Sequence, residues 1–329
     1  MDESQEESTK SIEFFINSDI IVWGDLMRLV NTTSDLAAYF KDKSVAAPLA
    51  AMKETGFRHI DLSLYNIIYE NSPWISTGDK WKKEIEECAK IADKLGFDFC
   101  QAHSPDPSDG NEATINAIRN SIEACGMLGI PHTVVHGLAP HGISPEEFVR
   151  LNVSFYKQFE EDLEKHKVDI LIENSSALWH PFYFLRTGED MRRFVENAGI
   201  SRMHICWDIG HGNAEGRNQY DDIVAMGDEL HALHVQDNLG TSDAHIMPLT
   251  GNTNFDMVMK GLCDIGYKGD FTFEATNSVR RANVWPHCRK NVREGDKLSD
   301  PPLFIKQKQQ TVMYEIGRWM LESYNIKAE

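Results

Sequence analysis

Acidic and histidine side chains recur in this chain directly after short apolar segments. The phrases concerned are HIDLS, QAHSP, VVHG, IENSS, WDIGH, HVQDN and FEATN, and their ligand-type residues are Asp61, His103, His136, Glu173, Asp208, His211, His234, Asp237 and Glu274. A single histidine in such a place is usually a hydrogen-bonded structural residue, but a carboxylate there is costly without a partner or a metal ion. Carboxylates and imidazoles that converge on one point suit Mn²⁺, Mg²⁺, Co²⁺ or Zn²⁺. The recurrence therefore predicts a divalent-metal site, with a purely polar pocket as the alternative.

The apolar segments themselves are typical of short buried strands. We expect strands at 12–16 or 19–23, 57–62, 97–102, 132–136, 168–173, 202–207, 230–236 and 269–274. A glycine followed by a large apolar residue precedes several of them, at Gly56, Gly96, Gly129, Gly199 and Gly266. Glycine just past a helix is the usual left-handed cap. Its recurrence at about 35 residues or twice that interval fits a series of strand–helix units.

Helices are expected between these strands. Ser144, Pro145 and Glu147 form a capping-box pattern, and apolar residues at helical spacing follow as far as Leu163. Two further helices are indicated by apolar residues at the same spacing. The first is marked by Ile115, Ile118, Ile122 and Cys125, and the last in the chain by Val312, Ile316, Trp319 and Met320.

Eight strands that alternate with helices predict a (β/α)₈ TIM barrel. A doubly wound sheet is the alternative, but it would normally carry a glycine-rich phosphate loop after its first strand, and the sequence has none. We expect residues 1–10 to form a disordered tail and residues 11–329 to form a single barrel domain. The stretch 277–303 is too long for a simple connection, so it is interpreted as a functional loop or lid.

Composition narrows the class of protein. The 329 residues include 33 Lys+Arg and 51 Asp+Glu, which gives a net charge of −18 and disfavours nucleic acid and anionic membranes as partners. The polar N-terminus resembles no signal peptide, and no apolar run approaches the ~18 residues of a membrane span. The six cysteines contain no CxxC pair, which indicates reduced thiols and a cytoplasmic location.

The phrases IEN, WDIGH, HVQD and FEA, in this order, resemble the xylose isomerase-like barrel superfamily, over about residues 55–275. The most similar branch is the sugar phosphate isomerase/epimerase family, which includes the ketose 3-epimerases. The resemblance implies one divalent ion, with Mn²⁺ favoured over Mg²⁺, Co²⁺ and Zn²⁺. It implies that the ligands are Glu173, Asp208, His234 and Glu274, and that His211 contacts the substrate.

The resemblance also implies a reaction. It implies a metal-dependent isomerase or epimerase that acts on a small carbohydrate through an enediolate, with Glu173 and Glu274 as the acid and base. A lyase or dehydratase acting on an inosose or keto-sugar could use the same site, and a homo-oligomer is possible. The epimerases carry an Arg after the seventh-strand histidine and a second Glu after the fifth-strand glutamate. This chain has neither, at 237–240 or 174–179, so the identity of the sugar does not transfer.

The other candidate site residues are expected to bind the carbohydrate. The expected substrate-binding residues are His211, His103, His136, Asp237, His245 and Asp61. The stretch 280–297 carries six basic and two acidic residues, a local charge of +4. This stretch is interpreted either as a solvated loop or as a lid that holds a phosphorylated or carboxylated substrate, with Arg280, Arg281 and Trp285 as the candidate lid residues.

A second branch of the superfamily offers a different reading of the same residues. Endonuclease IV, a DNA-repair nuclease on this barrel, uses three metals, and the chain has candidates for all of its additional ligands. These candidates are His103, His136, His211, Asp243 and His245. The net charge of −18 disfavours the nuclease. A non-catalytic relative that binds a sugar is the remaining alternative, and the complete ligand set weighs against it.

Overall fold

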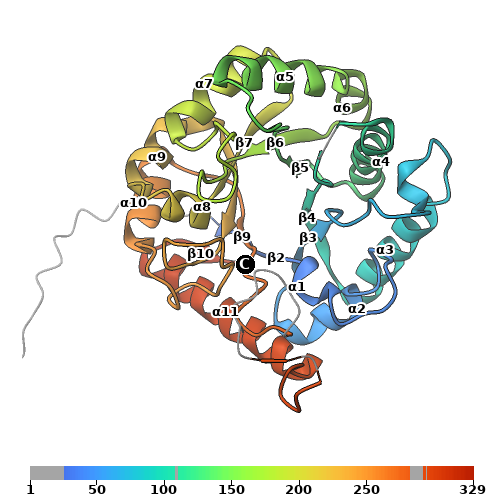
Figure 1. Ribbon diagram of the computed structural model, residues 1–329. Helices are drawn as coiled ribbons and strands as arrows, with labels where there is room; N and C mark the ends of the chain where they lie inside the picture. Colours follow the sequence, from blue (N-terminus) through green and yellow to red (C-terminus); the bar gives the residue numbers. More distant parts are fainter. Residues whose placement is uncertain (1–25, 108–109, 282–291, 294) are drawn as a thin grey trace, which may run out of the picture.

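The fold is a closed barrel of eight parallel strands, in a computed structural model that describes residues 26–107, 110–281, 292–293 and 295–329 (Figure 1). The strands are β2 (Leu29–Thr32), β3 (His59–Ser63), β4 (Asp98–His103), β5 (His132–Val135), β6 (Asp169–Glu173), β7 (Met203–Asp208), β8 (Leu230–Val235) and β9 (Phe271–Phe273). Each strand pairs with the next, and β9 pairs with β2. The TIM barrel is therefore confirmed, and the doubly wound sheet is wrong.

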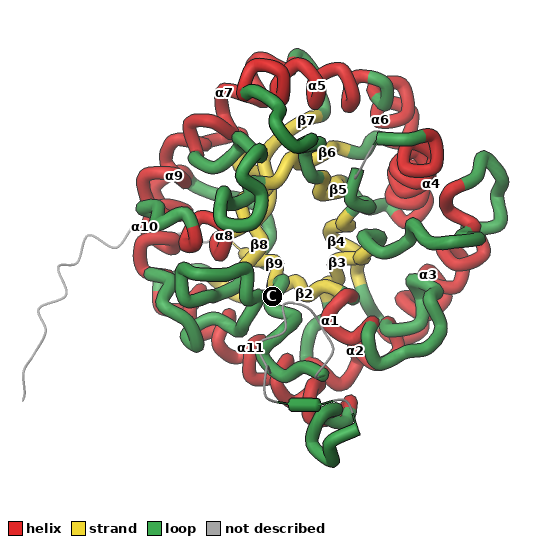
Figure 2. The backbone as a smooth tube through the Cα atoms, in the orientation of Figure 1, coloured by secondary structure: helices red, strands yellow, loops and turns green. Residues whose placement is uncertain are grey.

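Helices follow the strands, and the longer ones surround the barrel as an outer ring (Figure 2). They are α1 (Ser34–Ala37), α2 (Leu49–Met52), α3 (Lys82–Leu95), α4 (Glu112–Leu128), α5 (Pro145–Lys157), α6 (Glu160–His166), α7 (Gly188–Ala198), α8 (Ile209–Ala214), α9 (Gln219–Met226), α10 (Phe255–Ile265) and α11 (Leu303–Ser323). Short 3₁₀ turns lie at Lys53–Thr55, Pro73–Ile75 and Gly227–Glu229. A separate pair of parallel strands, β1 (Leu26–Met27) and β10 (Lys327–Ala328), joins the two ends of the described chain.

The first strand of the barrel is not where the sequence indicated. The expected strand at 12–16 or 19–23 lies outside the described residues, and the barrel closes through Leu29–Thr32 instead. Arg28 interrupts the apolar run and hid this strand. Its guanidinium lies at the amino end of the barrel, where Nε and Nη2 donate to Asp270 at 2.7 and 2.8 Å.

The capping box at Ser144 is confirmed, but the helix that it starts is shorter than expected. One continuous helix to Leu163 was wrong, because α5 ends at Lys157 and α6 begins at Glu160. The Gln158 side chain donates to the carbonyl of Phe155 at 2.8 Å. It thereby satisfies a carbonyl that an uninterrupted helix would have used, and the chain turns between the two helices.

The last helix packs on the barrel with only part of the face indicated by the sequence, since Met320 is buried and Ile316 packs against the core. Val312 and Trp319 are exposed, whereas Met313 is buried. Gly317 permits the close approach, because a Cβ at that position would lie 2.6 Å from the ring of Phe273. The apolar residues that marked this helix in the sequence therefore include two on its outer surface.

Two expectations from composition can be compared with the described residues. None of the helices in the described part of the chain combines the length and the apolar character that a membrane crossing requires. Cys88, Cys100, Cys125, Cys206 and Cys263 are all free thiols, as expected for reduced cysteines.

Candidate metal centre and active site

The carboxyl ends of strands β6 to β9 bring four acidic and histidine side chains together. Glu173 ends β6, Asp208 ends β7, His234 lies near the end of β8, and Glu274 follows β9. Each offers one ligand atom, and these atoms lie within 4.8 Å of one another. Because parallel strands end at the same face of a barrel, residues far apart in sequence meet here. These are the four residues that the family resemblance implied as ligands of one ion.

The imidazole of His234 lies between two of the carboxylates. Its Nδ1 is 3.1 Å from Oε1 of Glu173 and 3.2 Å from Oε2 of Glu274. The carboxamide of Gln101 lies 3.0 Å from Nε2, on the opposite edge of the ring. A ligand histidine is usually oriented by such a partner on its other nitrogen. Gln101 therefore fixes the ring so that Nδ1 faces the carboxylates.

Asp208 is held by backbone and side-chain amides. Its carboxylate caps helix α8 by accepting from the backbone N–H of His211 at 2.7 Å. The Asn174 side chain accepts from the backbone N–H of Asp208 at 2.6 Å and donates to its carbonyl at 3.0 Å. Gln236 Nε2 donates to the carboxylates of Asp208 and Asp243 at 3.2 and 3.1 Å. These contacts leave Asp208 one orientation, toward the other three ligands.

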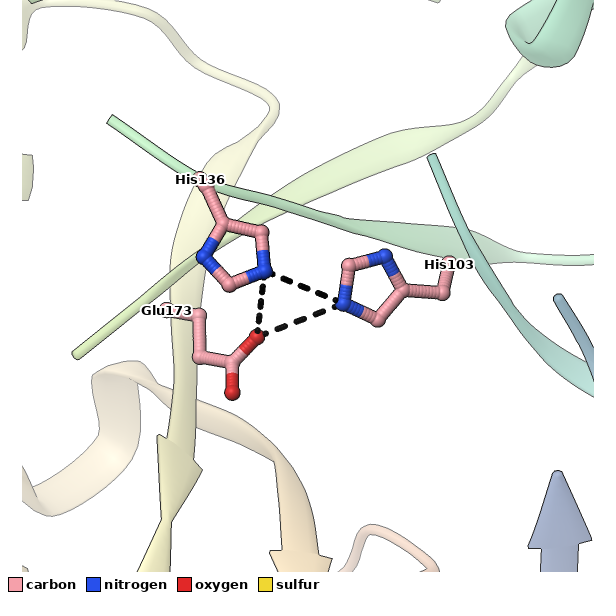
Figure 3. Close-up of side chains that lie close together, drawn as sticks. All are labelled: His103, His136 and Glu173. Carbon is pink, nitrogen blue, oxygen red and sulfur yellow. Dashed lines mark hydrogen bonds and ion pairs between the residues drawn. The ribbon is translucent and has the colours of Figure 1, made fainter. Parts of the chain in front are cut away.

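A second cluster adjoins the first through Glu173 (Figure 3). The Nε2 atoms of His103 and His136 lie 3.2 Å apart, and they lie 3.4 and 3.3 Å from Oε2 of Glu173. Among the described residues, this buried Oε2 has no partner with hydrogen-bond geometry. The structure therefore places the two predicted substrate histidines against a carboxylate oxygen that still needs a positive partner.

A third cluster lies on the other side of Asp208. Asp208, His211 and His245 each offer a ligand atom within 4.8 Å of the others. Oδ1 of Asp243 lies 3.3 Å from Nε2 of His211 and 3.0 Å from Nε2 of His245. The Nδ1 atoms of both rings are held by backbone carbonyls, at 2.8 Å to Asn174 and 2.7 Å to Glu274. Both imidazoles therefore direct Nε2 inward.

The charges of this region fit a bound cation. Burial alone would raise the pKa of Glu173, but the imidazoles of His234 and His136 outweigh it and hold that pKa well below its ordinary range. The pKa of Glu274 shifts in the same direction. Burial alone would raise this pKa, but the adjacent His234 outweighs the effect of burial and lowers it to about 2. Buried carboxylates in their charged form need positive partners, which are protonated imidazoles or a metal ion. An ion would take the place of the imidazole protons, and the oxygen and nitrogen donor set suits a divalent transition metal.

The pKa values of Asp208 and His211 are also shifted from their ordinary values. Burial raises the pKa of Asp208 to about 6, although His211 draws it in the opposite direction. Burial alone would lower the pKa of His211, but Asp208 and Asp243 raise it to about 10. Perturbed acids and bases gathered in one cleft are typical of functional sites.

A cavity of about 1140 Å³ opens above the clusters at the carboxyl face of the barrel. The candidate site residues that line it are His103, His136, Glu173, His211, Asp243, His245, Glu274, Arg280 and Arg281. Lys43 and Lys306 add two further cations to its wall, and Nζ of Lys306 pairs with Asp35 at 2.6 Å. The cavity has the size and the polar lining of a small-molecule site.

Two of the predicted substrate-binding residues, Asp237 and Asp61, do not line this cavity. The Asp237 carboxylate accepts from the backbone N–H groups of Asn238, Gly251 and Thr253 at 2.9, 2.8 and 3.1 Å, so it organises the loop and not a ligand. Asp61 is buried inside the barrel and does not line the cavity, and burial raises its pKa. Trp285 lies outside the described residues.

Two residues that orient the site were missed in the sequence. Gln101 precedes His103 by two positions, and Gln236 follows His234 by two. Because side chains alternate along a strand, residues two apart share a face. The same alternation that places the histidines inside the barrel therefore placed both glutamines there, and this signal could have found them.

A methyl group at Gly210 tests how tightly this arrangement is packed. A Cβ there would lie 2.1 Å from Cδ of the buried Gln236 side chain. Gly210→Ala is expected to destabilise the fold by about 1–3 kcal/mol, measured by urea unfolding, because overpacking of a buried site costs that much. The double variant Gly210→Ala/Gln236→Ala should be less destabilised than the sum of the two single variants. An unfolding free energy equal to that of the parent would contradict the close packing.

Comparisons with known proteins agree with the fold. A family model described as xylose isomerase-like TIM barrel matches residues 49–294. The uncharacterized protein MJ1311 of Methanocaldococcus jannaschii is 26% identical over 251 residues, which cover 72% of this chain and 81% of that protein. A D-psicose 3-epimerase of Enterocloster bolteae is 34% identical over 92 residues, 28% of this chain and 29% of that protein. A solved structure of a D-tagatose 3-epimerase-like protein aligns with a TM-score of 0.67 at 21% identity, covering 91% of this chain and 98% of that one.

Proposed function

Because the chain belongs to the xylose isomerase-like TIM barrel family, we propose that it is a divalent-metal-dependent enzyme that isomerises or epimerises a small carbohydrate. The observation that carries the proposal is that two carboxylates, the buried Glu173 and the partly buried Glu274, both face Nδ1 of the His234 imidazole, at 3.1 and 3.2 Å. The similarities to a D-psicose 3-epimerase and to a D-tagatose 3-epimerase-like protein support the same class of reaction.

The proposed roles follow from the geometry. Glu173, Asp208, His234 and Glu274 would hold the ion. A divalent ion at this position supplies the positive charge that offsets negative charge developing on a substrate oxygen. Glu173 and Glu274 are carboxylates in their charged form, so each can accept a proton from a carbon next to a carbonyl group. Two bases approaching that carbon from different directions are what an epimerisation needs.

The surrounding side chains suit a polyhydroxylated substrate. His103, His136 and His211 line the cavity, and their imidazole nitrogens can form hydrogen bonds with hydroxyl groups. The Trp179 ring packs edge-on against His211, and the Tyr65 ring packs edge-on against His103. Both rings line the cavity and offer apolar surface to the carbon skeleton of a sugar. Lys43 and Arg280 would accommodate a phosphate or carboxylate on the substrate, whereas Arg281 is paired with Asp300.

Solvent-isotope exchange tests the proposed reaction. A panel of ketoses, keto-sugars and their phosphates is incubated with the protein in D₂O with Mn²⁺, Co²⁺ or Zn²⁺, and the products are analysed by NMR. We expect deuterium at the carbon next to the carbonyl group of at least one sugar, together with its epimer or isomer. Loss of water from the substrate without an epimer would indicate a dehydratase on the same site. No exchange with any member of the panel would contradict the proposal.

The second and third clusters favour one alternative reaction. His103 with His136, and His211 with His245, are each placed to hold a further ion beside the central one. Several ions held close together are typical of enzymes that hydrolyse phosphoesters. A multi-metal phosphoesterase is therefore the second candidate function, and the metal count separates it from the first.

A further inference from the structure

A second group of ligand-type side chains lies at the opposite end of the barrel from the site described above. Asp169 opens strand β6, His204 is the second residue of β7, and His231 is the second residue of β8. Each offers one ligand atom, and these atoms lie within 4.8 Å of one another. The proposed function uses none of the three.

The alternation of side chains along the strands explains this grouping. Asp169 precedes Glu173 by four residues and His204 precedes Asp208 by four, so each pair points to the same side, the interior of the barrel. The pairing between β7 and β8 shifts register after Ile205, which leaves His231 as an extra residue on β8. A bulge of this kind redirects a side chain. It brings His231 beside His204, where the two rings stack with centroids 3.7 Å apart.

The contacts of His204 and Asp169 leave one ligand atom of each side chain for an ion, and the His231 ring would tilt out of its stack with His204 to reach the same ion. Nδ1 of His204 lies 2.8 Å from a carboxylate oxygen of Glu229, which leaves Nε2 for another partner. Arg202 Nη1 donates to Oδ1 of Asp169 at 2.9 Å, so the carboxylate can present its second oxygen. A histidine held at one nitrogen by a carboxylate is the usual arrangement of a metal ligand.

The charge state of the neighbouring rings also suits a metal. Burial lowers the pKa of His231, and the adjacent His204 lowers it further. His132 pairs in register with Asp169 on the next strand, and burial lowers its pKa to about 4. Nε2 of His132 is buried and has no hydrogen-bond partner among the described residues. Imidazole binds metals in its neutral form, and the lowered pKa values of His231 and His132 favour that form.

We propose that Asp169, His204 and His231 bind a divalent transition-metal ion at the amino end of the barrel. Two imidazoles and one carboxylate suit Zn²⁺, Ni²⁺, Co²⁺ or Cu²⁺ better than Mg²⁺ or Ca²⁺. The His204 and Asp169 side chains are 22% and 29% exposed, so an ion can enter and water can complete its coordination. An ion here links three neighbouring strands, and this face of a TIM barrel serves stability rather than chemistry.

Zinc binding to the full-length protein tests the site. Bound Zn²⁺ is counted by equilibrium dialysis, and the thermal midpoint is measured with and without Zn²⁺. We expect His204→Gln and His231→Gln each to bind one equivalent fewer than the parent and to lose at least half of the zinc-dependent rise in the midpoint. The matched control is His59→Gln, at the amino end of β3 and outside the cluster, which should keep both. The difference should persist in a His234→Gln background, which separates this site from the one at the carboxyl ends.

The spectrum of protein-bound Cu²⁺ gives a second readout, which reports the ligands of the ion directly. In a His234→Gln background, Cu²⁺ bound at the amino end should show electron-paramagnetic couplings to two imidazole nitrogens, and these couplings should be lost when His204 is also replaced by glutamine. Substitution of Asp169 by asparagine should weaken Cu²⁺ binding at least tenfold while the far-ultraviolet circular dichroism stays unchanged. Equal zinc counts in the parent and both histidine variants, or a copper spectrum without nitrogen couplings, would overturn the proposal.

Discussion

Replacement of Glu173 by glutamine is expected to lower turnover of the carbohydrate at least about a thousandfold, because general-base catalysis contributes up to about four orders of magnitude. Oε1 of Glu173 faces Nδ1 of His234 at 3.1 Å, and Oε2 faces His103 and His136. Glutamine keeps the shape of the side chain but cannot accept the proton, and it replaces a charged ligand by a neutral one. Turnover is measured together with metal content.

Two further variants, Glu146→Gln and Glu274→Gln, test the same mechanism. Glu146→Gln removes an exposed carboxylate from the first turn of α5, and it should retain the turnover of the parent. Glu274→Gln should also abolish epimerisation. If the two carboxylates serve opposite faces of the substrate, each variant should still exchange deuterium into the epimer whose C–H faces the remaining carboxylate. Near-parental turnover of either variant with its full metal content would contradict the two-base mechanism.

The barrel could be predicted from the sequence because its strands are short apolar runs with clear boundaries. The runs that end in Glu173, Asp208 and His234 correspond closely to β6, β7 and β8. The first strand could not be found in this way, since Arg28 interrupts its apolar run and pairs with Asp270, far away in the sequence. In the sequence alone, a charged residue at the end of a barrel strand cannot be told from a loop residue, because its ion-pair partner lies far away in the chain.

The same limit applies to the candidate site. Asp237 and Asp243 are equally plausible in the sequence, six residues apart after the same strand. In the structure, Asp237 pairs with Ile246 in an antiparallel bridge that folds the loop back on itself. This fold places Asp243 against His211 and His245, while the Asp237 carboxylate is used by backbone amides of the loop. Long-range loop geometry, and not residue type, decides which carboxylate reaches the cavity.

The number of metal ions separates the two candidate functions, and the histidines of the second cluster give the test. For a carbohydrate enzyme, His103→Ala and His136→Ala should leave the number of bound metal equivalents unchanged and raise KM about tenfold, the effect of one lost hydrogen bond of about 1.4 kcal/mol. For a multi-metal phosphoesterase, each variant should lose at least one equivalent. His141→Ala is the matched control, since His141 is exposed and packs on Phe182.

The charge of the protein decides which outcome we expect. A DNA duplex is drawn to a protein by several Lys or Arg around the site, and a net charge of −18 would repel its phosphates at physiological salt. Of the basic residues that line the cavity, Lys306 is paired with Asp35 and Arg281 with Asp300. We therefore expect no cleavage of DNA that contains an abasic site, with Mn²⁺ or Zn²⁺ present, and unchanged metal counts in both histidine variants. Cleavage by the parent, together with loss of two or more equivalents in those variants, would assign the three clusters to phosphoester hydrolysis instead.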